Sequence, residues 1–323
     1  MGIAVLCSGG DSAGMNPAIR KFVDKCISVG EEPFFIYDGL EGMIDKSIKK
    51  ASHKDVAGII YKGGTVIRSS RSKRFFDYKY RKIAFENLKE FDITKLVVLG
   101  GDGSFRALRQ FYDDFKIKFV GIPATIDNDI FATEYCLGVD TALNTIRTAL
   151  DNIRDTASSF KRAFVVEVMG KECGYLALIS ALTSGAEVCV IPEIGYNLNN
   201  LGIRLKREVK EGRNYAVAIV AEGTDATNEI KTWLQNDVGM DTRITILGHI
   251  QRGGNPTVYD RLMGFEFMEY GLKNLLTGKI DNGVVTYKNG KFGMETIEYV
   301  TSQKYKIKDD LLKLAGKMTG VYI

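Results

Sequence analysis

The chain has 323 residues, more than one hydrophobic core usually covers, so two domains are expected. Its 44 lysines and arginines exceed its 40 aspartates and glutamates only slightly, and they do not gather into basic runs. This charge balance argues against a nucleic-acid partner. It suits a small anionic substrate, which a few arginines can bind.

The five cysteines are scattered and form no CxxC pair, so neither a zinc site nor a disulfide framework is expected. Cys7 ends an apolar run and Cys26 lies on the apolar side of a predicted helix, which indicates buried thiols in a reducing compartment. The sequence starts directly with a strand, without a signal segment, and no apolar run is long enough to cross a bilayer. We therefore expect a cytoplasmic protein with no membrane partner.

The first half of the chain alternates strands and helices. The apolar run 3–7 predicts a strand, and Asn16 and Pro17 predict the N-cap and first residue of a helix. The buried side of that helix is expected to carry Ile19, Phe22, Val23, Cys26 and Ile27. The next expected elements are a strand over 34–37, a helix over 78–91, a strand over 96–99 and a helix from 104 to about 114.

The second half continues the alternation. It predicts a long helix over about 140–157, a helix over 174–185, and strands over 163–168, 188–191, 216–221 and 244–247. Continuously apolar strands are typical of parallel sheets covered on both faces. We therefore predict an α/β fold with two Rossmann-like three-layer domains, mainly parallel sheets, and the active site in the cleft between the domains.

Three of the predicted strands run into loops rich in glycine, small hydroxyls and carboxylates. These loops are Ser8–Asp11, Gly100–Ser104 and Pro123–Asp129. Glycine lets a phosphate approach backbone N–H groups, and carboxylates can hold Mg²⁺ or accept a proton. The pattern predicts a kinase.

The carboxylates of Asp102, Asp127 and Asp129 are the candidate metal ligands and proton acceptor. Each also has an ordinary interpretation, since Gly-Asp-Gly is common in turns and Asp-Asn-Asp can form an Asx turn or a helix cap. If the three converge, each pair about 6 Å apart repels by about 3 kcal/mol at an effective dielectric of about 20. A cation is then expected among them, and Mg²⁺ carrying nucleotide phosphates fits best.

The chain has neither the GxxxxGK[ST] motif nor GxGxxG after a strand, so the nucleotide must be held in another way. Gly10, the turn 101–104 and a cation from the segment 62–71 can hold its phosphates. Further cations and polar groups occur at Arg162, Met169–Lys171, Glu222–Gly223, Arg243 and Gly248–Gly254. Any one arginine can be a solvated surface charge. Together, at the ends of predicted strands, they indicate one pocket for a phosphorylated polyol.

In this order, and together with Arg154–Thr156, the motifs resemble the bacterial-type ATP-dependent 6-phosphofructokinases over essentially the whole chain. The resemblance implies transfer of a phosphoryl group from MgATP to the 1-hydroxyl of D-fructose 6-phosphate, the committed step of glycolysis, in a homotetramer. It also implies a larger ATP- and Mg²⁺-binding domain, residues 1–138 plus about 251–300. A smaller fructose 6-phosphate domain would comprise 139–250 plus about 301–323.

The resemblance also implies residue roles. Asp127 is the implied general base, Thr125 positions the transferred group, and Arg71 stabilises its charge, while Asp102 and Asp129 are linked to Mg²⁺. The implied ATP site comprises Gly10, Arg71, Ser72, Gly101, Asp102, Gly103 and Ser104. The implied sugar-phosphate site comprises Thr125, Asp127, Met169, Gly170, Lys171, Glu222, His249 and Arg252, completed across a subunit interface by Arg162 and Arg243.

Several positions depart from the family pattern. Pyrophosphate-using relatives have aspartate at the position of Gly103 and lysine at that of Ala124, so ATP is the expected donor. Ala124 itself replaces a glycine, Lys171 an arginine, and Leu40 a tyrosine near the adenine.

The effector site of the family is altered more strongly. Arg20, Arg154, Glu187 and Arg213 keep its pattern. Asp24 and Glu211 stand where basic residues are usual, and Tyr215 replaces a histidine. Because these changes reverse charge, we expect weak control by ADP and phosphoenolpyruvate.

Two alternatives remain open. The first is a kinase of the wider Gly-Gly-Asp-Gly group that acts on NAD or a lipid. Against it, Arg162, Arg243, His249 and Arg252 together favour a sugar phosphate as substrate. The second is a non-catalytic sensor of sugar phosphates or nucleotides. Against it, Asp102, Asp127 and Asp129 are all present, and a sensor does not need a general base beside a metal ion.

Overall fold

The chain forms two compact units in a computed structural model that describes residues 2–321. Unit 1 runs to Ile126 and continues with Ile130–Thr141 and Arg252–Tyr305. Unit 2 comprises Asp127–Asp129, Ala142–Gln251 and the chain from Lys306 onward. The division expected from the sequence kept residues 127–129 in the larger domain, whereas here they group with unit 2.

Unit 1 is built on one sheet, in which the strand order is β12-β11-β6-β5-β1-β2-β3, with β4 beside β1. Its strands are β1 (Gly2–Ser8), β2 (Glu32–Ile36), β3 (Ile48–Lys50), β4 (Ser69–Ser70), β5 (Ile93–Gly100), β6 (Lys118–Pro123), β11 (Asn282–Lys288) and β12 (Lys291–Glu295). The pairings are parallel except at the two edges, where β3 and β12 run antiparallel to their neighbours.

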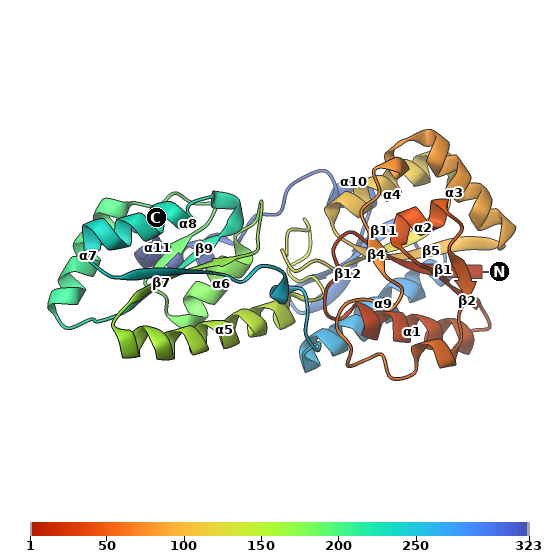
Figure 1. The fold of residues 1–323 in the computed structure, drawn as a ribbon. Helices are drawn as coiled ribbons and strands as arrows, with labels where there is room; N and C mark the ends of the chain where they lie inside the picture. Colours follow the sequence, from red (N-terminus) through yellow and green to blue (C-terminus); the bar gives the residue numbers. More distant parts are fainter. Residues whose placement is uncertain (1, 322–323) are drawn as a thin grey trace. The chain divides into compact units, whose positions relative to one another are not determined.

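Helices cover both faces of this sheet (Figure 1). They are α1 (Met15–Ser28), α2 (Gly39–Ile44), α3 (Tyr78–Glu90), α4 (Asp102–Phe115), α9 (Val258–Leu276) and α10 (Ile297–Val300). Helices α1 and α9 share one core with the sheet, in which Phe22 and Phe267 pack with Val5, Val97 and Val120. Along each strand, these valines alternate with buried residues that face the other side of the sheet. The strands are therefore continuously apolar because the sheet is covered on both faces, as predicted.

The start of α1 differs from the prediction, because the helix begins at Met15 and its N-cap is Gly14. The Asn16 side chain is buried and serves another purpose. Its Nδ2 donates to the carbonyl oxygens of Lys62 and Gly63, and its Oδ1 accepts from the N–H of Val66, 2.8 Å away. Asn16 therefore anchors the 62–66 loop. Ile27, expected on the buried side of α1, is 39% exposed.

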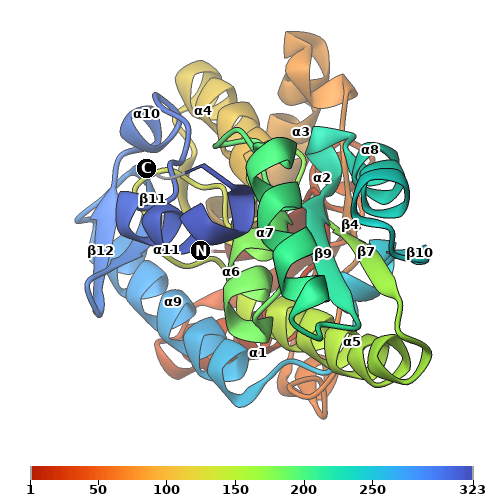
Figure 2. The same cartoon turned by 90° about the vertical axis from the view of Figure 1, so that its left-hand side faces the viewer.

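Unit 2 contains a parallel sheet in the order β10-β7-β9-β8. Its strands are β7 (Ala163–Val168), β8 (Val188–Val190), β9 (Ala216–Ala221) and β10 (Thr242–Ile246), and its helices are α5 (Val139–Phe160), α6 (Tyr175–Ser184), α7 (Leu198–Lys210), α8 (Thr227–Trp233) and α11 (Asp309–Thr319). Helices α7 and α8 share a core with one face of the sheet. In both views α8 and α5 lie on opposite sides of β7 (Figure 1 and Figure 2).

The predicted α/β class, with mainly parallel sheets in two domains, is confirmed. The predicted ranges of β7 and β9 coincide with the observed strands. Helix α4 begins two residues earlier than predicted, so Asp102 is its first residue and not part of a preceding turn. Within residues 2–321, no helix combines the length and apolar character needed to cross a membrane.

Candidate active site

The three strand ends that lead into the predicted loops, at Ser8, Gly100 and Pro123, lie side by side in unit 1. Strand β5 is paired in parallel with both β1 and β6, and Gly100 is in register with Ser8 and with Pro123. Ser104 Oγ donates to Ser8 Oγ over 2.8 Å, and the N–H of Ala124 donates to the carbonyl oxygen of Gly100 over 3.0 Å. The carboxyl ends of three parallel strands therefore present their loops at one edge, where α/β folds bind ligands.

Glycine is required at this edge because the backbones are close. A Cβ on Gly100 would lie 2.8 Å from the carbonyl oxygen of Ser8. Gly10 differs, since a Cβ there would meet only the movable end of the Arg252 side chain, 1.9 Å from its Nη1. Gly101 is the N-cap of α4, a helix of 14 residues whose amino terminus attracts anions through its dipole and unpaired N–H groups. The second turn is therefore suited to hold a phosphate.

Asp102 and Gly103 begin α4. Oδ2 of Asp102 accepts a hydrogen bond from Nε of Arg106 over 2.6 Å, one helical turn away. A Cβ built on Gly103 would meet no described atom within 4 Å. The space beside Gly103 is therefore open, and an aspartate there would add charge as well as bulk.

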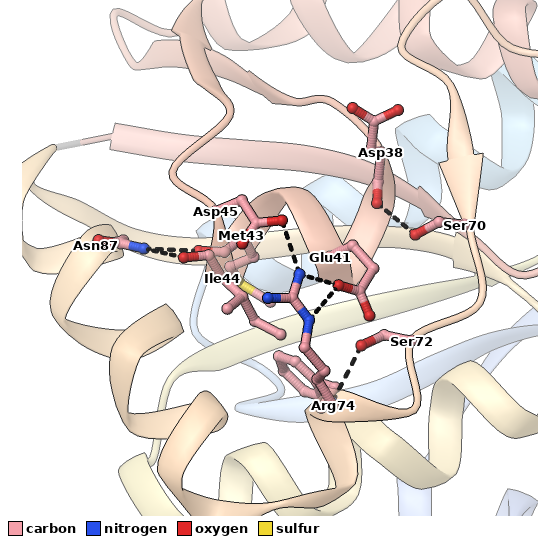
Figure 3. Close-up of polar contacts among 10 residues, drawn as sticks. Asp38, Glu41, Met43, Ile44, Asp45, Ser70, Ser72, Arg74 and Asn87 are labelled. Carbon is pink, nitrogen blue, oxygen red and sulfur yellow. Dashed lines mark hydrogen bonds and ion pairs between the residues drawn. The ribbon is translucent and has the colours of Figure 1, made fainter.

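The segment that carries Arg71 and Ser72 follows β4 and is tied to the first turn. The N–H of Gly9 donates to the carbonyl oxygen of Ser70, and Ser69 Oγ donates to the carbonyl oxygen of Gly9. Arg71 is exposed, while Ser72 is buried and its Oγ accepts from the N–H of Phe75 over 3.0 Å (Figure 3). Arg71 is thus presented to solvent next to the first glycine turn.

The third loop continues from β6 through Thr125. A Cβ on Gly101 would lie 3.7 Å from the Cβ of Thr125, so Thr125 neighbours the second turn. Asn128 is buried and has a left-handed backbone with φ 51°, a conformation that asparagine tolerates better than most residues. This turn separates Asp127 from Asp129.

Carboxylates that suit Mg²⁺ are present, but not as a cluster of three. Among residues 2–321, no group of three or more His, Cys, Asp and Glu side chains is arranged to hold a metal ion. The convergence of Asp102, Asp127 and Asp129 stays a prediction, because Asp102 belongs to unit 1 and the other two to unit 2. Mg²⁺ bound to nucleotide phosphates keeps several waters and takes only one or two carboxylates, so a cluster of three is not needed for such a site.

In unit 2, the predicted sugar-phosphate residues gather at the carboxyl edge of the sheet. Met169–Lys171 follow β7, Glu222 follows β9, and the turn 248–251 follows β10. The N–H of Met169 donates to Oε1 of Gln251 over 3.1 Å, and the N–H of Gly170 donates to Oε1 of Glu222 over 3.4 Å. These bonds connect the three loops, and His249 lies exposed in the last of them.

Arg162 and Arg243 do not belong to that edge. Arg162 immediately precedes β7 and Arg243 is the second residue of β10, so both lie where these parallel strands begin. Both form ion pairs with Asp241, and these outweigh desolvation and lower the pKa of Asp241. The expectation of one pocket built from all these residues is wrong within a single chain, because the two arginines lie at the opposite end of the sheet.

Arg252 groups with unit 1, whereas Gln251, directly before it in the sequence, groups with unit 2. Its guanidinium lies against Gly10, and a Cβ on Gly63 would lie 2.1 Å from the carbonyl oxygen of Gly254. The segment 252–254 therefore packs on the first glycine turn and the 62–66 loop.

A buried carboxylate that the sequence analysis did not single out holds part of unit 1 together. Asp260 is fully buried and accepts from the hydroxyl of Tyr135, the N–H of Gly138, and both the N–H and the hydroxyl of Thr141. Burial raises the pKa of Asp260 despite these hydrogen bonds. Asp260 therefore holds the segment around Gly138 and Thr141, shortly after Asp129, in place. No spacing pattern in the sequence indicates this role, because the partners of Asp260 lie about 120 residues earlier.

The fold and its loops define an α/β protein that binds phosphates at the carboxyl ends of parallel strands. Residues 2–273 match the family model described as phosphofructokinase, and the chain belongs to this family.

Several relatives are similar over nearly their whole length. The chain is 54% identical to the ATP-dependent 6-phosphofructokinase of Sulfurimonas denitrificans, over 98% of this chain and 99% of the relative. Identity is also 54% to the protein of the same name from Wolinella succinogenes, with the same coverage. The corresponding protein of Thermotoga petrophila is 42% identical, over 94% of this chain and 95% of the relative.

Solved structures show the same fold. The phosphofructokinase of Saccharomyces cerevisiae superposes with a TM-score of 0.88 at 32% identity, over 98% of this chain and 47% of that one, so this chain spans about half its length. A pyrophosphate-dependent phosphofructokinase from Marinobacter aquaeolei superposes with a TM-score of 0.84 at 19% identity, over 96% of this chain and 86% of that one. The second similarity concerns the fold alone.

Proposed function

We propose that this chain is an ATP-dependent 6-phosphofructokinase, which transfers the γ-phosphoryl group of ATP to the 1-hydroxyl of D-fructose 6-phosphate. The products are fructose 1,6-bisphosphate and ADP, and the reaction is the committed step of glycolysis. The observation that carries the proposal is the edge of unit 1 where the three strand ends lie side by side, in a chain 54% identical to enzymes of that name. Five buried free cysteines suit a cytoplasmic location.

Unit 1 is the proposed ATP-binding domain. The backbone of Gly10, Gly101 and Gly103 and the hydroxyls of Ser72 and Ser104 bind the phosphates, and Arg71 supplies the positive charge. Asp102 and Asp129 are the proposed carboxylates for Mg²⁺, which neutralises phosphate charge when bound. Gly103 and Ala124 leave the site without the aspartate and lysine of pyrophosphate enzymes, which favours ATP.

Unit 2 is the proposed fructose 6-phosphate domain. Met169, Gly170, Glu222 and His249 bind the sugar, and Lys171 and Arg252 are its cations. Lys171 replaces a forked arginine with a point charge, so affinity falls more than turnover. Asp127 accepts the proton of the 1-hydroxyl as that oxygen attacks phosphorus, and Thr125 positions the transferred group.

We propose a homotetramer in which Arg162 and Arg243 act in the site of a neighbouring subunit. Their place at the beginning of β7 and β10, away from Met169 and Glu222, supports this assignment. Each ion pair with Asp241 is partly exposed, so the arginines can exchange it for a phosphate at little cost.

A donor and acceptor assay tests the activity. Purified protein is given Mg²⁺ and fructose 6-phosphate with ATP, GTP or pyrophosphate, and ATP should give the highest kcat/KM, with GTP testing the effect of Leu40. Activity with pyrophosphate alone would contradict the donor assignment. Phosphorylation of NAD or a lipid, or tight binding without turnover, would favour the alternative kinases or a sensor.

We also propose that ADP and phosphoenolpyruvate control this enzyme weakly. Arg20 Nε donates to Oδ2 of Asp24 over 2.7 Å, and Asp24 is also 3.0 Å from Nδ1 of His53. Asp24 thus neutralises a cation that an effector phosphate needs.

One cation of unit 2, Arg213, supports the same proposal. Arg213 pairs with Glu187 over 2.5 Å and with Glu208 over 2.9 Å, and these residues line a cavity of about 250 Å³. Arg154 differs, since its Nε and Nη2 are buried without a hydrogen-bond partner among the described residues. Fructose 6-phosphate saturation curves with and without each effector should nearly coincide, and a large shift of the half-saturation point would refute weak control.

A further inference from the structure

The segment that carries Arg71 and Ser72 is attached to α2 on both sides of these residues (Figure 3). On one side, Ser70 Oγ donates to the carbonyl oxygen of Asp38 over 2.6 Å, at the N-cap of α2. On the other side, Arg74 binds α2 and the residue that follows it. The segment is therefore held at two points four residues apart.

Arg74 makes several contacts at once. Its Nε donates to Oε2 of Glu41 over 2.7 Å, and its Nη2 contacts the same oxygen and donates to Oδ2 of Asp45 over 2.7 Å. Its guanidinium also lies 5.5 Å from the ring centroid of Tyr80 in α3. The hydrogen bonds that Arg74 donates to Asp45 and Glu41 raise the pKa of Arg74. The forked guanidinium joins two carboxylates, which a lysine in its place cannot reproduce.

Helix α2 is itself fixed against the first glycine turn. Gly39 has φ 59°, and a Cβ there would lie 2.4 Å from the carbonyl oxygen of Cys7, directly before Ser8. At the other end, Asn87 Nδ2 donates to the carbonyl oxygens of Met43 and Ile44 over 3.0 and 2.8 Å (Figure 3). A segment tied to α2 is therefore also held relative to the turn 8–11.

We propose that Arg74 is a positioning residue for phosphoryl transfer. Through Glu41 and Asp45 it holds the backbone of Arg71 and Ser72 beside the glycine turns, so that the Arg71 guanidinium meets the ATP phosphates. This inference rests on the proposed role of Arg71. It assigns to Arg74 a role without contact to substrate, because a small displacement of a group that stabilises charge costs a large factor in rate.

The test compares Arg74→Gln with the intact enzyme in steady-state kinetics. We expect kcat/KM for ATP to fall about tenfold, with the KM for fructose 6-phosphate and Tm nearly unchanged. Arg74→Lys should recover only part of the loss. In a double-mutant cycle, Glu41→Gln combined with Arg74→Gln should be no worse than Arg74→Gln alone, because both act through one contact. As matched control, Glu90→Gln removes the pair with Lys46, and should leave the kinetics unchanged.

The outcomes separate this inference from the proposed role of Arg71. If Arg71→Ala reduces kcat/KM for ATP and Arg74→Gln does not, Arg74 has no positioning role. If Arg74→Gln lowers Tm and affects both substrates equally, its role is general stability and the inference fails. If Arg71→Ala itself has no effect, the proposed role of Arg71 fails first.

Discussion

At the scale of single residues, Asp127 carries the proposed catalytic carboxylate and directly precedes Asn128, whose backbone is left-handed. Replacing Asp127 by Asn keeps the shape but removes the proposed proton acceptor. We expect kcat to fall by about 10² to 10⁴, the range for loss of a positioned general base, while ATP binding is retained. Turnover assays and calorimetric ATP titration measure the two effects. Asp151→Asn, on the exposed side of α5, is the control. Near-normal turnover of the Asp127 variant would remove Asp127 from the mechanism.

Replacing the buried Asp260 by Asn should lower the stability of the folded protein. In Asp260→Asn an amide N–H₂ group must face the N–H donors of Gly138 or Thr141, so a buried donor loses its acceptor. We expect a loss of about 1–3 kcal/mol in the free energy of unfolding, seen as a lower Tm.

The same carboxylate predicts a pH dependence. Because burial raises the pKa of Asp260 above its ordinary value of 3.8, its protonation stabilises the folded state. That contribution is complete below pH 3.8 and is lost as the pH rises through the raised value. The Tm difference between the intact protein and Asp260→Asn should therefore narrow from pH 4 upward. A difference that widens over this range would contradict the assignment.

At the scale of elements, the loops after β7 and β9 depend on a close backbone contact. A Cβ on Gly223 would lie 1.8 Å from the carbonyl oxygen of Lys171, so Gly223→Ala must push the two loops apart. We expect the KM for fructose 6-phosphate to rise about tenfold or more, with the KM for ATP much less affected. The matched control is Gly195→Ala, because a Cβ there meets no described atom within 4 Å. An equal rise in both KM values would argue against a sugar-phosphate role for this pair of loops.

Element prediction succeeded where the local pattern and the final packing agree. The runs 163–168 and 216–221 are buried on both faces, and both are strands over those residues. It failed at Asn16, whose type and place before Pro17 fit an N-cap. In the structure, the Asn16 side chain forms hydrogen bonds with the 62–66 loop and does not cap the helix. Ile27 likewise has helical spacing but lies at the end of α1, where it is largely uncovered.

At the scale of the whole molecule, the positions of Arg162 and Arg243 predict sites completed between subunits. Arg162→Ala and Asp127→Asn should each be nearly inactive alone. After the two variants are unfolded together and refolded, mixed tetramers should regain part of the activity, because a site can then take Asp127 from one chain and Arg162 from the other. Kinetic assays and sizing of the mixture measure the recovery. Mixed tetramers without activity would show that Arg162 does not act across an interface.

The order of strands, helices and glycine turns follows from the sequence itself, because hydrophobic periodicity and glycine chemistry act over a few residues. The identities of Asp102, Asp127, Asp129 and the other candidate site residues could be read in the same way. Only the tertiary structure decided that Ser8, Gly100 and Pro123 are adjacent, that Arg243 lies near the start of its strand and Glu222 after the end of another, and that Asp260 and Arg74 hold distant segments. These are contacts between residues tens to more than a hundred positions apart, and they depend on which strands pair and which side chains are buried together, which no local pattern encodes.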